Sequence, residues 1–166
     1  KVMASAASSL KRVTLELGGN DAAIVLDDVD PKAAAKQLFE GAMVTSGQVC
    51  LAIKRAYVPA SMYDAICAEL ATLADAAVVG DGMKPDTQFG PIQNKMQYDR
   101  VKSLIADAAQ KGKVIAGGEH KGPGYFIRPT LARVCGLLLV ARMLRTVRRT
   151  FSSSSSANSH SQGARS

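Results

Sequence analysis

Apolar positions in the first 131 residues follow two periods, which predict strands alternating with helices. Alternating or β-branched runs predict strands at 13–17, 22–26, 53–58, 78–79, 114–116 and 125–127. Apolar residues three and four positions apart predict helices at 31–45, 61–73 and 94–110. This alternation indicates an α/β domain.

Local signals sharpen the first two helices. Asp30 before Pro31 is typical of an N-cap residue followed by proline in the first helical position. Ser61 is the expected cap of the second helix. The first helix should end near Thr45 to Gly47, which places Cys50 just beyond a helix end, in a glycine-containing loop.

The sequence changes character after Leu131. Residues 1–131 carry 15 Lys and Arg against 14 Asp and Glu, whereas 132–166 carry six Arg and no acidic residue. The basic charge therefore belongs to the tail, and nucleic-acid binding is not indicated for the whole chain. Three interpretations of the tail are open: disorder over 151–166, a basic amphipathic helix over 134–149, or non-native sequence from out-of-frame translation or cloning, which we favour.

Cysteine number and hydropathy limit the class of protein. Three cysteines without a C-x-x-C pair argue against a disulfide framework or a zinc site, and favour a reducing, cytoplasmic location. No apolar run is long enough to predict a transmembrane helix. The chain does not begin with methionine, so we expect sequence upstream of Lys1.

Two side chains are candidates for chemistry. Cys50 follows Ser46-Gly47-Gln48, and a thiolate there could attack a carbonyl carbon, although isolated cysteines more often serve as packing residues, as we expect for Cys67. Glu16 lies in the predicted strand 13–17, where an outward, solvated carboxylate is the ordinary interpretation. The glycines after that strand would leave Glu16 near an open edge, where it could activate a water molecule.

The segment Leu10 to Asn20, which contains Glu16-Leu17-Gly18-Gly19, resembles the end of the nucleotide-binding domain of aldehyde dehydrogenases. Ser46 to Cys50 resembles the nucleophile segment of that family, 34 positions after the glutamate. Further landmarks follow in the expected order: Phe89-Gly90-Pro91, Gly124-Tyr125-Phe126 and Pro129-Thr130-Leu131. The resemblance implies the end of a nucleotide-binding domain over 1–18, part of a catalytic domain over 19–131, and a tail over 132–166. The implied fold is α/β, an open sheet with flanking helices, truncated.

The resemblance also implies a reaction. An aldehyde would be oxidised to a carboxylic acid with NAD or NADP through a thiohemiacetal and a thioester on Cys50, with the Cys50 N–H holding the oxyanion. Glu16 would activate the hydrolytic water, which favours hydrolysis over acyl transfer to coenzyme A. The resemblance places Leu17, Gly18, Gln97 and Arg100 near the cofactor. For the last two, an exposed helix face is the alternative interpretation. No metal is implied.

The family fold needs a longer chain, so these residues resemble a fragment that we expect to be inactive alone. Full-length relatives are expected to be homo-oligomers that bind a small aldehyde, with no nucleic acid or membrane as partner. The alternative function is a non-catalytic α/β interaction module whose basic tail binds acidic partners or a membrane.

Overall fold

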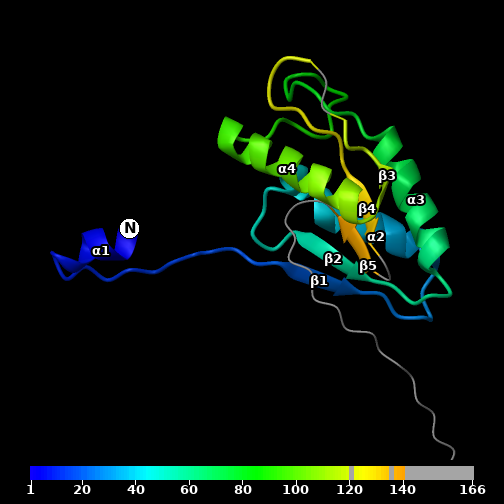
Figure 1. The fold of residues 1–166 in the computed structure, drawn as a ribbon, viewed down its shortest axis with the longest axis horizontal. Coiled ribbons are helices and arrows are strands. Elements are labelled where there is room, and N and C mark those ends of the chain that lie inside the picture. The colour runs from blue at the N-terminus through cyan, green and yellow to red at the C-terminus, as the bar shows by residue number, and fades with distance from the viewer. Residues whose placement is uncertain (120–121, 135–136, 141–166) are drawn as a thin grey trace, which may run out of the picture.

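The computed structural model describes residues 1–119, 122–134 and 137–140. A five-stranded sheet has the order β1-β2-β5-β4-β3, with β1 and β2 parallel and the other neighbours antiparallel (Figure 1). The strands are β1 (Asp21–Ile24), β2 (Ile53–Tyr57), β3 (Lys113–Ala116), β4 (Leu131–Val134) and β5 (Leu137–Val140). The predicted α/β class is confirmed.

Three long helices cover the sheet. α2 (Pro31–Met43) and α3 (Tyr63–Ala76) pack against each other behind the sheet, and α4 (Lys95–Lys111) lies in front of it (Figure 1). The core lies between the sheet and the pair of helices, and its largest fully buried side chains are Ile66, Leu70 and Leu131. The apolar periodicity of the sequence identified α2 and α3 because their inward-facing residues form that core, and α4 because its own inward face buries Val101 and Ala108.

The helix N-termini test the expected caps. Asp30 caps α2 as predicted, since its Oδ2 accepts a hydrogen bond from the Ala33 N–H at 2.8 Å. Ser61 does not cap α3, so that prediction was wrong. A backbone turn leads into α3 instead, in which the Met62 N–H donates to the Pro59 carbonyl at 3.0 Å.

Three predicted strands are absent from the described structure. Residues 13–17 are extended but pair with no described strand, so their backbone groups lack a ladder partner. Val79 forms a single bridge with Phe89. Residues 125–127 form no strand, because Tyr125 accepts a hydrogen bond from Ile92 in a loop crossing and the regular strand begins later, at Leu131.

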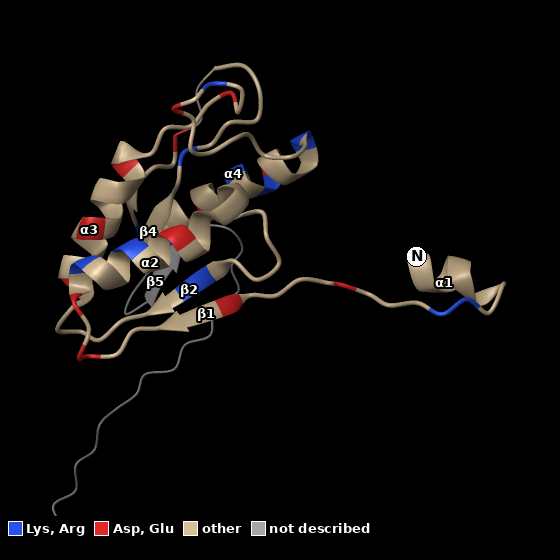
Figure 2. Ribbon diagram, turned by 180° about the vertical axis from the view of Figure 1, so that it is seen from behind, with Lys and Arg blue, Asp and Glu red and all other residues tan. Residues whose placement is uncertain are grey.

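An arm precedes the body of the molecule. It consists of the short helix α1 (Val2–Ala7) and the exposed segment up to Asn20, and it runs away from β1 (Figures 1 and 2). Acidic and basic residues are interspersed over the body (Figure 2). No described helix is both long enough and apolar enough to cross a membrane.

The predicted boundary at 131 falls inside the sheet. β4 continues to Val134, and β5 pairs with both β2 and β4. Residues 137–140 therefore form a strand and not part of the helix that was one of the expectations for 134–149. A strand can form here because the edges of β2 and β4 both offer unpaired backbone groups between which β5 fits. The remainder of the tail, 141–166, lies outside the described residues.

Candidate active site

The loop that carries Cys50 begins at the end of α2 with unusual backbone geometry. Residues Val44–Gly47 form a 3-10 turn in which Thr45, Ser46 and Gly47 all have positive φ angles of 49°, 56° and 70°. Only Gly47 adopts this region without steric cost. The chain therefore reverses sharply before Cys50, as the sequence predicted, and neighbouring contacts must hold two strained residues in place.

Side-chain hydrogen bonds supply that support. Gln48 donates through Nε2 to the Pro91 carbonyl at 3.1 Å, and its Oε1 accepts from the Gln93 N–H at 2.8 Å. Ser46 Oγ donates to the Gly90 carbonyl at 3.3 Å. These bonds tie the cysteine loop to residues 90–93, which include part of one of the landmarks in the sequence. Gln93 had no role in the sequence interpretation, because nothing local to it marks a contact with Gln48.

The end of the arm meets the cysteine loop. The Gly19 N–H donates to the Cys50 carbonyl at 3.3 Å. Gly18 has a φ of +69°, and a Cβ added there would lie 3.9 Å from the Cys50 Cβ. A side chain at position 18 would thus be in van der Waals contact with the Cys50 side chain, and the positive φ angle disfavours any residue but glycine there.

All but one of the candidate residues line a single cavity of about 370 Å³. Leu17 and Gly18 come from the arm, Cys50 from the loop, and Gln97 and Arg100 from α4. Gln97 and Arg100 are both exposed, so each is on the surface of its helix and on the wall of an open cavity at once. Glu16 is exposed and does not line the cavity.

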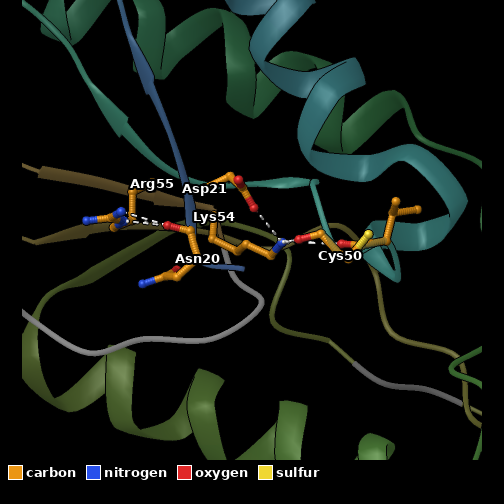
Figure 3. Close-up of polar contacts among 6 residues, drawn as sticks. Asn20, Asp21, Cys50, Lys54 and Arg55 are labelled. Atoms are coloured by element: carbon orange, nitrogen blue, oxygen red, sulfur yellow. Dashed lines mark hydrogen bonds and ion pairs between the residues drawn. The ribbon is translucent and has the colours of Figure 1, made fainter. Parts of the chain in front are cut away.

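Lys54 is a residue of the site that the sequence interpretation missed. Its Nζ donates to the carbonyls of Cys50 at 2.7 Å and Val49 at 3.2 Å, and lies 3.5 Å from Asp21 Oδ2 (Figure 3). The only clue in the sequence is that this lysine falls within the predicted strand 53–58, where a charged side chain is ordinarily expected to face solvent. The fold buries it instead, with its side chain 8% exposed.

The cysteines occupy different environments. Cys50 is exposed on the cavity wall, whereas Cys67 is buried in α3, as the packing interpretation predicted. Burial raises the pKa of the Cys67 thiol, so fewer molecules carry a thiolate there at neutral pH. Cys135 lies outside the described residues. No group of three or more potential metal ligands occurs in the described part of the chain.

The cavity fits one end of a nicotinamide cofactor. The Gln97 amide and the Arg100 guanidinium offer donors for ribose hydroxyls or phosphate oxygens, and Leu17 offers an apolar contact for a flat ring. The absence of a side chain at Gly18 leaves room beside Cys50. The volume lies at the lower end of the range for small-molecule sites, which suits part of a dinucleotide together with a small substrate.

The sequence model of the aldehyde dehydrogenase family matches residues 1–136. The chain belongs to the aldehyde dehydrogenase family. The match passes the predicted boundary at 131 and includes β4. The family suggested by the glutamate and cysteine segments is therefore confirmed.

Curated aldehyde dehydrogenases share this segment at similar levels of identity. A probable aldehyde dehydrogenase of Pseudomonas sp is 44% identical over 128 residues, 76% of this chain and 26% of that protein. The sulfoacetaldehyde dehydrogenase of Neptuniibacter caesariensis is 40% identical over 127 residues, 76% of this chain and 28% of that protein. The chain thus spans about a quarter of the length of these relatives.

Solved aldehyde dehydrogenases share the fold. The NAD+ complex of the Bacillus cereus enzyme is 37% identical, with a TM-score of 0.71 over 78% of this chain and 27% of that one. Lactaldehyde dehydrogenase from Escherichia coli is 36% identical, with a TM-score of 0.72 over 79% and 28%. The predicted fold, a truncated part of the aldehyde dehydrogenase α/β architecture, is confirmed.

Proposed function

We propose that this chain carries the nucleophile and the general base of an NAD- or NADP-dependent aldehyde dehydrogenase that releases a free carboxylic acid. The observation that supports it is the single cavity shared by Cys50, Leu17, Gly18, Gln97 and Arg100. Three separate segments of the chain meet there, and the one exposed thiol among the described residues lies on its wall.

The first step belongs to Cys50. Its thiolate attacks the aldehyde carbonyl carbon, a C–S bond forms, and the carbonyl oxygen becomes an oxyanion. The Cys50 N–H is the proposed donor to that oxygen, because backbone donors stabilise charge where it develops. When bound, the nicotinamide cofactor supplies the acceptor for a hydride from the former aldehyde carbon, and as the oxyanion re-forms the C=O bond the adduct becomes a thioester on Cys50.

Glu16 is the proposed base for hydrolysis of the thioester. It removes a proton from water, and the resulting hydroxide attacks the acyl carbon and releases the Cys50 thiolate. Glu16 precedes Gly18 by two residues, a span of about 7 Å in extended chain, so its carboxylate is within short reach of the cavity that Gly18 lines. The arm must turn the side chain inward for this role.

The rest of the cofactor site and the substrate pocket would come from other parts of the full-length enzyme. Leu17, Gly18, Gln97 and Arg100 would hold only the nicotinamide end of NAD or NADP. We therefore propose that the 166-residue chain does not turn over alone. The substrate is an aldehyde, and the functional assembly is a homo-oligomer in a cytoplasmic location. The alternative role as a basic interaction module rests on the tail 132–166, of which residues 135–136 and 141–166 lie outside the described structure.

The test uses the full-length enzyme that contains this segment, with aldehyde-dependent NADH or NADPH formation as the readout. Cys50→Ala should reduce the rate to background, while Cys67→Ala, which removes a thiol outside the cavity, should retain activity if the variant is folded. Glu16→Gln should slow turnover by about 10²- to 10⁴-fold. It should also leave a burst of one reduced cofactor per Cys50, because thioester formation does not need this base.

Two results would contradict the proposal. Full activity in Cys50→Ala would exclude the nucleophile, and turnover in Glu16→Gln equal to that of a Glu40→Gln control would exclude the base. Glu40 is a suitable control because it is an exposed carboxylate on α2 whose salt bridge to Lys36 is long, at 3.9 Å. Aldehyde-dependent cofactor reduction by the 166-residue chain itself would show that the missing parts are not required.

A further inference from the structure

Lys54 is a buried cation with three acceptors around it. Its ammonium has three N–H groups and lies near the Cys50 carbonyl (2.7 Å), the Val49 carbonyl (3.2 Å) and Asp21 Oδ2 (3.5 Å). Burying an ammonium is costly unless it is paired and hydrogen-bonded. All three of its partners lie in or beside the site, so the charge is directed at the cysteine loop rather than at solvent.

The contacts fix the backbone on both sides of the Cys50 Cα. The carbonyls of Val49 and Cys50 belong to the two peptide planes that meet at that atom, and both accept from the same ammonium. Fixing both planes fixes φ and ψ of Cys50, and with them the direction of the bond to its side chain. The Gly19 N–H, which also donates to the Cys50 carbonyl, adds to this restraint.

The same geometry orients the Cys50 N–H. In a trans peptide the N–H points opposite to the carbonyl of the preceding residue, and no cis peptide occurs in the described chain. Because the Val49 carbonyl points to Lys54, the Cys50 N–H points away from it. No described residue accepts a hydrogen bond from that N–H, so it stays available for an oxyanion.

We propose that Lys54 is a positioning residue that aims the Cys50 N–H at the oxyanion of the reaction, with Asp21 as its counter-ion. This inference rests on the proposed function of Cys50. The next residue of β2 extends the arrangement: Arg55 donates through Nε and Nη2 to the Asn20 carbonyl at 3.2 and 2.6 Å (Figure 3). Adjacent cations of one strand thus hold the cysteine loop and the end of the arm.

Two reactions of Cys50 distinguish an effect on the position of its N–H from an effect on the accessibility of its thiol. In alkylation by iodoacetamide the thiolate displaces iodide from carbon, and no oxyanion forms. In acylation by p-nitrophenyl acetate the thiolate attacks the acetyl carbon through an oxyanion, and p-nitrophenolate leaves with the electron pair. Both can be followed on the full-length enzyme that contains this segment, by mass spectrometry of the peptide that contains Cys50, with the peptide of Cys67 as an internal reference.

Lys54→Met should slow acylation of Cys50 by about 10- to 100-fold, because a misdirected oxyanion donor loses most of its effect. Alkylation should change less than about threefold, since it needs no such donor. Lys54→Arg should restore part of the acylation rate. The control Lys36→Met, which removes an exposed lysine of α2, should leave both rates unchanged.

An equal fall of both rates in Lys54→Met would overturn the inference, since it would report altered access to the thiol. If circular dichroism shows that this variant is unfolded, Asp21→Asn replaces it. Loss of the counter-ion should then slow acylation more than alkylation, and equal effects would again overturn the inference. If wild-type Cys50 is acylated no faster than Cys67, the proposed function fails and the inference fails with it.

Discussion

The arm and the body of the molecule each supply part of the candidate chemistry, and they are held in different ways. Cys50 belongs to the body, where Gln48, Ser46 and Lys54 restrain its loop by side-chain hydrogen bonds. Glu16 belongs to the arm, where its neighbour Leu17 is 85% exposed. The candidate nucleophile is therefore restrained by local contacts, whereas no described residue forms a hydrogen bond or an ion pair with the Glu16 side chain.

The difference between the regions lies in burial. The body encloses a continuous apolar core between α2, α3 and the sheet, which includes Leu70 at 0% exposure. Every residue of 7–20 is exposed, including apolar side chains that alternate as in a strand. Alternation alone does not make a strand, because the backbone of a strand needs a partner to satisfy its hydrogen bonds.

The largest contrast should come from matched leucine truncations. Leu70→Ala should lower the free energy of unfolding by about 2–5 kcal/mol, because it leaves a cavity in the core. Leu15→Ala in the arm should change it by less than about 0.5 kcal/mol, since an exposed side chain leaves no cavity. Urea denaturation of the 166-residue chain measures both. Equal losses would mean that the arm folds onto the body, and the contrast between the regions would disappear.

A second contrast concerns pH. Burial and the neighbouring Cys67 raise the pKa of Tyr63 to about 12. A phenol whose pKa is higher in the folded than in the unfolded protein contributes stability that is intact below pH 10 and is lost as the pH rises through 12. We expect about 2 kcal/mol to be lost in this interval on account of Tyr63.

Tyr63→Phe should remove that part of the pH dependence. The variant should be about as stable as the wild type at pH 7, because the buried Tyr63 hydroxyl bonds to no described nitrogen or oxygen atom and has only the weak acceptor of the Cys67 thiol beside it. Tyr125→Phe, which changes a more exposed ring, is the control and should keep the wild-type profile. Denaturation midpoints from pH 8 to 12 measure the effect, and identical profiles for Tyr63→Phe and wild type would contradict it.

The smallest expected difference in stability is between substitutions at the N-termini of α2 and α3, both in the body. Asp30→Ala should cost about 1 kcal/mol, because the Ala33 N–H loses its acceptor at the start of α2. Ser61→Ala should cost almost nothing, since the turn before α3 is closed by backbone carbonyls. Thermal unfolding of both variants compares them. A larger loss for Ser61→Ala would show that the predicted cap forms in solution.

Sequence reasoning succeeded where structure is decided locally. The three long helices, the Asp30 cap and the loop before Cys50 all follow from spacing and from residue types that prefer one backbone conformation. It failed at residues 13–17 and 125–127, where a strand-like pattern has no described partner, and it missed β5, whose partners are β2 and β4. Strand pairing depends on distant segments, which periodicity does not specify.

For the site, the sequence by itself determined which residues are candidates for chemistry. The Glu16 and Cys50 segments and their spacing indicated the family, and the family match confirmed it. Tertiary structure decided which of these residues meet: it brought Cys50, Gly18 and α4 around one cavity and left Glu16 outside it. It also buried Lys54 against the Cys50 carbonyl. The carbonyls of Cys50 and Val49 lie only four and five residues before Lys54, but folding is what buries this lysine and brings Asp21 to it from β1. No pattern within the strand encodes that burial.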